Sequence, residues 1–193
     1  AAEITVLPFG LPRNDETAVA EGRTRCGKLG VAGMRIDAEF IARSTAIREA
    51  LQSGNLEGAR GMLGRDYSMS GRVVRGLGLG RKLGFPTANV EVPSSICLPA
   101  DGVYAGWYVR PDGTRQACAM NLGRRPTFYE HADHSLLEAH LIDFEGDLYG
   151  EQARVQFTHF LRGERKFDGI DALIGQLRTD VDRARAVLSA SAR

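Results

Sequence analysis

From Met69 onward, apolar and polar positions alternate in short segments, which is the pattern of half-buried β-strands. The strands that this pattern predicts are Met69–Gly76, Val103–Arg110, Arg115–Leu122, Leu136–Phe144 and Ala153–Leu161. Pro111-Asp112-Gly113 is a turn that joins the second and third of these strands as a hairpin. Short strands separated by turn residues predict a small antiparallel barrel.

The apolar spacing changes to three and four residues near the C-terminal end, which predicts an amphipathic helix. Its apolar positions are Ile170, Leu173, Ile174, Leu177, Val181, Ala184 and Leu188. Asp168 is the expected N-cap of this helix. Two short helices are expected before the strands, at Ala46–Ser53, which Gly54 closes, and at Leu56–Leu63. Residues 1–43 are only weakly patterned.

Composition excludes several classes of protein. The chain has 25 basic and 24 acidic residues and a net charge of +1, which does not indicate a nucleic-acid-binding surface. It contains no apolar run long enough to span a membrane, and Ala1–Gly10 lacks the basic start of a secretory signal. Cys26, Cys97 and Cys118 match no zinc pattern, so we expect reduced thiols and a cytoplasmic protein. The oligomeric state cannot be read from the sequence.

The segment with the most chemical information is Gly76–Asn89, Gly-Leu-Gly-Leu-Gly-Arg-Lys-Leu-Gly-Phe-Pro-Thr-Ala-Asn, which we call the glycine-rich segment. Its glycines let backbone N–H groups close on an anion, and Arg81 and Lys82 add positive charge. If the chain is extended there, Thr87 and Asn89 point to the same side, so their oxygens can share one cation. The pattern favours a nucleotide, although no Gly-Lys-Ser/Thr triplet of a P-loop is present. The alternative is a structural turn with two solvated cations.

Glu138 is the second candidate for chemistry. In the predicted strand Leu136–Phe144, Glu138 and His140 point to one face, and the apolar residues beside them point to the other. A carboxylate among apolar strand neighbours is either paired at the surface or placed for catalysis, and the strand pattern leaves both open. We expect His140 to be a half-buried strand residue.

Seven motifs follow one another in a fixed order over about residues 66–188. They are Gly71–Gly76, Gly80–Asn89, Leu98–Ala105, Asn121–Phe128, Leu137–Phe144, Asp147–Gly150 and Leu161–Phe167. In this order they resemble the riboflavin kinase module, in particular the C-terminal half of the bacterial bifunctional riboflavin kinase/FAD synthetase. The resemblance implies a six-stranded antiparallel Greek-key barrel with a C-terminal helix, over residues 64–193. It also implies transfer of the ATP γ-phosphate to the ribityl 5′-hydroxyl of riboflavin, which gives FMN and ADP.

The resemblance further implies roles for individual residues. Glu138 matches the proposed catalytic base of the family, and Thr87 and Asn89 match its ligands for magnesium and nucleotide. The residues that match the flap over the ATP phosphates are Gly78, Gly80, Arg81, Lys82 and Gly84. Arg162 and Arg165 match the basic segment beside the flavin pocket, and their alternative role is that of solvated charges at a helix entrance. The implied ligands are therefore ATP with magnesium, and riboflavin or FMN.

Residues 1–63 resemble the end of the family's adenylyltransferase half. The family's Ser-Ser-Thr-x-Ile-Arg motif corresponds to Arg43-Ser44-Thr45-Ala46-Ile47-Arg48, where Arg43 replaces the first serine. The alternative interpretation of Ser44–Arg48 is a helix cap followed by a solvated arginine. The family's early His-x-Gly-His-type motif is not present, because the histidines are His131, His134, His140 and His159. We therefore expect residues 1–63 to be a partial α/β remnant without adenylyl transfer.

Two further functions remain open. In the first, the chain is part of a bifunctional parent protein that also makes FAD. In the second, the chain binds flavin without turnover. The presence of Glu138, Thr87 and Asn89 together favours an active kinase. Arg124-Arg125-Pro126-Thr127 resembles another family motif and is expected to form a structural turn near the site.

Overall fold

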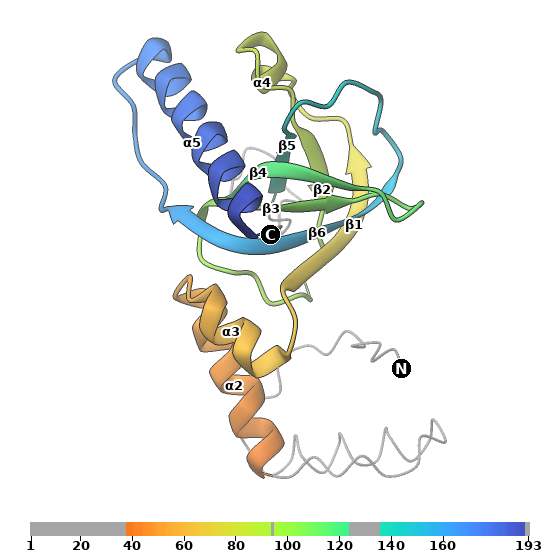
Figure 1. Ribbon diagram of the computed structural model, residues 1–193, viewed down its shortest axis with the longest axis vertical. Coiled ribbons are helices and arrows are strands. Elements are labelled where there is room, and N and C mark those ends of the chain that lie inside the picture. The colour runs from red at the N-terminus through yellow and green to blue at the C-terminus, as the bar shows by residue number, and fades with distance from the viewer. Residues whose placement is uncertain (1–37, 94, 124–135, 192–193) are drawn as a thin grey trace, which may run out of the picture. The chain divides into compact units, whose positions relative to one another are not determined.

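The computed structural model describes residues 38–93, 95–123 and 136–191. Six antiparallel strands close into a barrel in the order β1-β2-β5-β4-β3-β6 (Figure 1). The strands are β1 (Tyr67–Val74), β2 (Ala88–Glu91), β3 (Gly102–Val109), β4 (Arg115–Gly123), β5 (Leu136–Leu141) and β6 (Gln152–Arg162). The helices are α2 (Ala38–Gln52), α3 (Leu56–Leu63), α4 (Leu79–Lys82) and α5 (Ile170–Ser191). The six-stranded barrel with a C-terminal helix, which the family resemblance implied, is confirmed.

The short strand β2 is the one that the alternation of residues did not predict. It covers only four residues, and Pro86 and Pro93 lie close to its two ends. Proline and asparagine are both uncommon in strands, so this stretch gives a weak signal. The glycine-rich segment therefore ends in a strand of the barrel, and it also contains the single helical turn α4.

The helix boundaries show where local signals were sufficient. Helix α3 has the predicted ends: the side chain of Asn55 accepts a hydrogen bond from the backbone N–H of Gly58, and Gly64 is left-handed at the C-cap. Helix α2 begins earlier than predicted, because Ala38, Glu39, Ala42 and Arg43 are good helix formers. A helix cap within Ser44–Arg48 is therefore wrong, since these residues lie inside the helix. The prediction that Asp168 caps α5 was wrong. The helix begins one residue later, and the carbonyl of Gly169 accepts from the N–H of Leu173.

Several sequence predictions fall outside the described residues. These are the weakly patterned residues 1–37, Cys26, His131, His134 and the expected turn Arg124-Arg125-Pro126-Thr127. Among the helices that the structure describes, none has the length and apolar composition of a membrane-spanning segment.

The inward-facing residues of all six strands form one core. Tyr104, Tyr108 and Phe157 are among its largest fully buried side chains, and the rings of Tyr104 and Phe157 meet edge to face at 5.1 Å. The compact unit that contains the barrel extends over Ile47–Arg193. Within it, Leu51 at the end of α2 belongs to the same core cluster, and its carbonyl accepts from the N–H of Ala100 at 2.9 Å. Leu56 and Ala59 of α3 are buried in that cluster as well.

Helix α5 covers the outer face of β3 and β4. A second apolar cluster joins Val103 and Ala105 of β3 to Ala184 and Leu188 of the helix. Two ion pairs add to this contact. Arg162 at the end of β6 pairs with Asp180, whose side chain is only 6% exposed, and Arg185 pairs with Asp143, whose side chain is 68% exposed.

These two ion pairs give a matched test of burial. We expect Asp180→Asn to lower the free energy of unfolding by about 3 kcal/mol, because it leaves the Arg162 guanidinium without its buried counter-charge. Asp143→Asn removes an exposed charge and keeps a residue that tolerates the left-handed backbone at this position (φ 56°), so its effect should be much smaller. Urea unfolding followed by circular dichroism measures both. Equal losses in the two variants would contradict this explanation.

Candidate active site

One row of paired residues crosses the outer face of the barrel. Asn89 on β2 is opposite Glu138 on β5, and Glu138 is opposite Asn121 on β4. The row continues through Val103 on β3 to Arg162 on β6. Directly opposed residues of a sheet point to the same face. The fold therefore brings three of the predicted site residues, which are far apart in the sequence, into a single row.

The row lies outside the core, because its neighbours along the strands point inward. Leu137 and Ala139, on either side of Glu138, are fully buried, and Ala88 and Val90, on either side of Asn89, are also buried. The predicted alternation around Glu138 is confirmed, and the Glu138 side chain itself is half-buried. Its catalytic role stays a prediction.

The distances along the row from Glu138 to the other polar residues differ. Adjacent strands are about 4.8 Å apart, so Asn89 and Asn121 are immediate neighbours of Glu138. Arg162 lies three strands away, which corresponds to about 14 Å along the sheet. Val103, which lies between Asn121 and Arg162 in the row, is packed against α5, so the helix covers the part of the row between Glu138 and Arg162.

Two glycines early in the glycine-rich segment lie against the side chains of Thr87 and Asn89 at its end. A Cβ atom on Gly76 would lie 2.5 Å from Nδ2 of Asn89, and one on Gly80 would lie 3.4 Å from Oγ1 of Thr87. The Asn89 amide thus lies near Gly76 and the Thr87 hydroxyl near Gly80, and the shared side of their oxygens stays a prediction. Asn89 is only 6% exposed, although it lies on the outer face. The glycines are needed here for close approach.

The same segment is closed by its own backbone. The N–H of Phe85 donates to the carbonyl of Gly80 at 2.8 Å, and the N–H of Lys82 donates to that of Gly78 at 3.4 Å. Gly78 and Gly84 adopt positive φ angles of 68° and 86°, which favour glycine. Arg81 and Lys82 are exposed on α4. Two cations therefore project from a compact turn beside Thr87.

A surface pocket lies next to this turn. Arg81, Pro86 and Thr87 line it on one side, and Phe144, Asp147, Leu148 and Tyr149 are among the residues that line the rest. No individual role was predicted for the Asp147–Gly150 segment, although its membership in the ordered motifs indicated that it belongs with the site. The guanidinium of Arg75 lies over the ring of Tyr149, 4.8 Å from its centre.

The donors near this pocket suit a hard cation that is shared with phosphates. In the described part of the chain, no group of three or more His, Cys, Asp or Glu residues is arranged to hold a metal ion. Thr87 and Asn89, the predicted ligands, each carry one neutral side-chain oxygen. Magnesium commonly takes few protein oxygens and completes its shell with phosphate oxygens and water. The two residues fit such an ion only together with a nucleotide.

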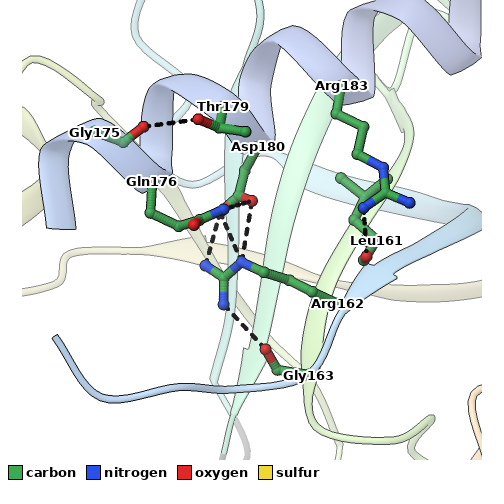
Figure 2. A network of polar contacts seen from close by, with 8 residues as sticks. All are labelled: Leu161, Arg162, Gly163, Gly175, Gln176, Thr179, Asp180 and Arg183. Atoms are coloured by element: carbon green, nitrogen blue, oxygen red, sulfur yellow. Dashed lines mark hydrogen bonds and ion pairs between the residues drawn. The ribbon is translucent and has the colours of Figure 1, made fainter. Parts of the chain in front are cut away.

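Arg162 is already engaged within the protein (Figure 2). Its Nε lies 3.0 and 3.1 Å from the two carboxylate oxygens of Asp180, and its Nη2 lies 2.7 Å from one of them. Its Nη1 donates to the carbonyl of Gly163 at 3.0 Å, and Gln176 donates to Asp180 at 2.7 Å. Arg162 therefore ties β6 to α5. Sequence reasoning missed Asp180, because an aspartate within an amphipathic helix is usually exposed.

Arg165 differs from Arg162 in its environment. It is exposed, and its guanidinium lies 4.9 Å from the centre of the Phe167 ring. Arg162 faces the same ring at 5.7 Å. The structure thus places both predicted flavin-binding arginines around one aromatic side chain, and their contact with flavin stays a prediction.

The two described cysteines, Cys97 and Cys118, are free. Burial raises the pKa of both thiols above the ordinary value. The thiol of Cys118 is fully enclosed and donates to the carbonyl of Gly106 at 3.4 Å. A protonated, buried thiol is a poor nucleophile, so Cys118 is a packing residue.

The fold and the site together define a small closed-barrel protein. Its outer face carries the row from Asn89 to Arg162, which is polar except at Val103 and which we call the polar row, next to a glycine-rich turn. A family model described as riboflavin kinase matches residues 63–188, which is more than half of the chain. The chain therefore belongs to the riboflavin kinase family.

The descriptions of the curated relatives agree with this assignment, and a solved structure is similar in sequence and fold. A bifunctional riboflavin kinase/FMN adenylyltransferase from Haemophilus influenzae is 42% identical over 78% of this chain and 48% of its own length. The protein of the same description from Bacillus subtilis is 39% identical over 73% of this chain and 45% of its own. The chain thus spans about half the length of these relatives. A crystal structure described as a macrolide-efflux protein from Streptococcus pneumoniae is 34% identical, with a TM-score of 0.67 over 74% of this chain and 46% of that one.

The close approach of Gly76 to Asn89 gives a second prediction. We expect Gly76→Ala to lower the free energy of unfolding by about 1–3 kcal/mol, because the added methyl group meets the Asn89 amide. In an Asn89→Ala background, the same change should cost clearly less. Gly61→Ala in α3 is the control, since nothing lies within 4 Å of its added Cβ. Urea unfolding of the unaltered chain, the two single variants at Gly76 and Asn89 and the double variant forms a double-mutant cycle. Equal costs of Gly76→Ala in both backgrounds would contradict the contact.

Proposed function

We propose that the chain is a riboflavin kinase, which transfers the γ-phosphate of ATP to the 5′-hydroxyl of the ribityl chain of riboflavin. The observation that carries this proposal is the pairing of Asn89 with Glu138, which puts a nucleotide-side residue beside a carboxylate. Both residues, and the whole glycine-rich segment, lie within the residues that match the family model. ATP and riboflavin are the proposed substrates, and FMN and ADP the products.

Glu138 is the proposed general base. Its carboxylate takes the proton of the ribityl 5′-hydroxyl as that oxygen forms a bond to the γ-phosphorus. The bond from the γ-phosphorus to the β,γ-bridging oxygen breaks, and ADP leaves with the bond's electron pair. General-base assistance of this kind typically contributes about 10²–10⁴ in rate. The remainder comes from holding the two substrates in line and from stabilising the phosphate charge.

Thr87 and Asn89 are the proposed protein ligands of magnesium bound with ATP. The ion would neutralise charge on the transferring phosphate. Gly78, Gly80 and Gly84 form the proposed turn over the phosphates. Arg81 lines the pocket and Lys82 follows it in the chain, and both are exposed, so they are available to phosphate oxygens.

Arg162 and Arg165 are the proposed basic residues of the flavin side. Arg165 is exposed next to Phe167, where a guanidinium and an aromatic ring can both lie against a flat ring system. Arg162 is held by Asp180, so its contribution is to fix the start of the segment that carries Arg165. The Asp180 contact thereby links α5 to flavin binding.

The rest of the predicted organisation is also part of this proposal. Residues 1–63 are assigned to the end of an adenylyltransferase domain and residues 64–193 to the kinase domain. The described thiols are free, which agrees with action in the cytoplasm. Because the relatives are described as bifunctional, a longer protein that also converts FMN to FAD is the second candidate.

Separation of flavins after incubation with riboflavin, ATP and magnesium tests the proposal. Formation of FMN without FAD supports kinase activity of this chain. Formation of FAD supports the bifunctional reading, and unchanged riboflavin in the presence of bound flavin supports a binding module. Removal of magnesium with a chelator should abolish FMN formation, and excess magnesium should restore it. Full activity after chelation would refute the proposed role of Thr87 and Asn89.

Glu138→Gln tests the proposed base directly. We expect kcat to fall by about 10²–10⁴, because the amide cannot accept the hydroxyl proton, while riboflavin binding stays close to that of the unchanged protein. Glu91→Gln is the matched control, since Glu91 is an exposed glutamate on the neighbouring strand β2. Stopped assays give kcat, and flavin fluorescence gives the binding constant. A Glu138→Gln variant with full turnover would end the assignment of the base.

A further inference from the structure

His140 makes contacts that neither strand pairing nor the proposed chemistry accounts for. It lies on β5, two residues after Glu138, on the same outer face. One ring nitrogen, Nδ1, is 2.8 Å from the backbone oxygen of Pro86. A carbonyl oxygen only accepts hydrogen bonds, so Nδ1 carries the proton and donates it.

A second contact joins His140 to the same point of the glycine-rich segment. The ring of Phe85 meets the imidazole edge to face, with 5.6 Å between the ring centres and 69° between the planes. Phe85 is also the residue whose N–H closes the turn on Gly80. The imidazole thus contacts both residues at the end of the turn, through a hydrogen bond to one and a ring contact to the other.

The position of these contacts along the ladder explains their use. Pairing of β2 with β5 runs from Glu91 and Leu136 to Ala88 and Ala139, and it ends there. The next pair in that register would be Thr87 with His140. Pro86 has no N–H group, so its carbonyl is its only backbone hydrogen-bonding group. The His140 side chain therefore continues the attachment of the segment to β5 just beyond the last paired residues.

We infer that His140 is a positioning residue, which holds the Phe85–Pro86 end of the glycine-rich segment against β5. This inference rests on the proposed function for its consequence in catalysis. Glu138 and His140 share one strand, whereas Thr87 directly follows Pro86. The imidazole thereby fixes the distance between Thr87, on the proposed nucleotide side, and Glu138, the proposed base. His140 itself need not touch either substrate.

Two substitutions of His140 separate the hydrogen bond from the ring, and a third variant is the control. His140→Leu keeps bulk but removes the donor. His140→Asn keeps an N–H donor at the same number of bonds from the backbone as Nδ1. His159→Ala on β6 is the control. This histidine is also half-buried, but its Nδ1 atom lies 3.0 Å from the hydroxyl of the adjacent Thr158, so this contact stays within one strand.

Two measurements read out the effect. One is the kinetics of FMN formation, together with the equilibrium binding of a non-hydrolysable ATP analogue in the presence of magnesium. The other is hydrogen exchange of the Phe85 amide in the unliganded protein, with the amide of Tyr108 in β3 as internal reference. For His140→Leu we expect KM for ATP and the analogue's dissociation constant to rise about 3- to 10-fold, which is the size of one hydrogen bond.

The expected pattern also includes faster exchange at Phe85, an unchanged KM for riboflavin, and restoration by His140→Asn. Wild-type values in His140→Leu would overturn the inference. So would His140→Asn with a collapsed kcat and an unchanged analogue affinity, because the ring would then act on the reacting atoms. If the unaltered chain forms no FMN, the proposed function fails, whereas exchange at Phe85 still decides whether His140 holds the segment.

Discussion

The pairing of β2 with β5 is the contact on which the site depends. It joins only four residues of each strand, yet it brings Asn89 beside Glu138 across about fifty residues of chain. Its register is set by the core, because Ala88, Val90, Leu137 and Ala139 all point inward and are buried. A slip by one residue would turn Asn89 and Glu138 into the core. The packing of four apolar side chains therefore also aligns the proposed chemistry.

The far end of the polar row is held by a different kind of contact. Arg162 is fixed by Asp180 of α5, and both side chains are largely buried. A buried ion pair contributes little net stability compared with well-packed apolar residues, but it is specific in geometry. Here it sets where β6 ends and where the segment with Arg165 begins. Apolar packing thus fixes one end of the row, and a charged contact fixes the other.

The sequence was sufficient where a local pattern decided the structure. Alternation predicted five of the strands, and the end of α3 followed from Gly64, whereas the Asn55 cap at its start was found only in the structure. Strand β2 was not found by alternation, because four residues between prolines give too short a pattern. The family resemblance nevertheless implied a sixth strand, and it named Glu138 and Asn89 together. The contact of Asp180 with Arg162 and that of His140 with Pro86 join distant parts of the chain, so no local pattern indicated them.

The match to the family model and the compact folding unit begin at different residues. The family match begins at residue 63, close to the predicted domain limit. The compact unit begins at Ile47, because Leu51, Leu56 and Ala59 share the core of the barrel. Burial of three such side chains removes apolar surface that the barrel would otherwise expose to water. Residues that carry none of the family's kinase motifs therefore help to stabilise the barrel whose pairing aligns the proposed site. Sequence motifs mark where the proposed chemistry begins, whereas buried contacts mark where the folding unit begins.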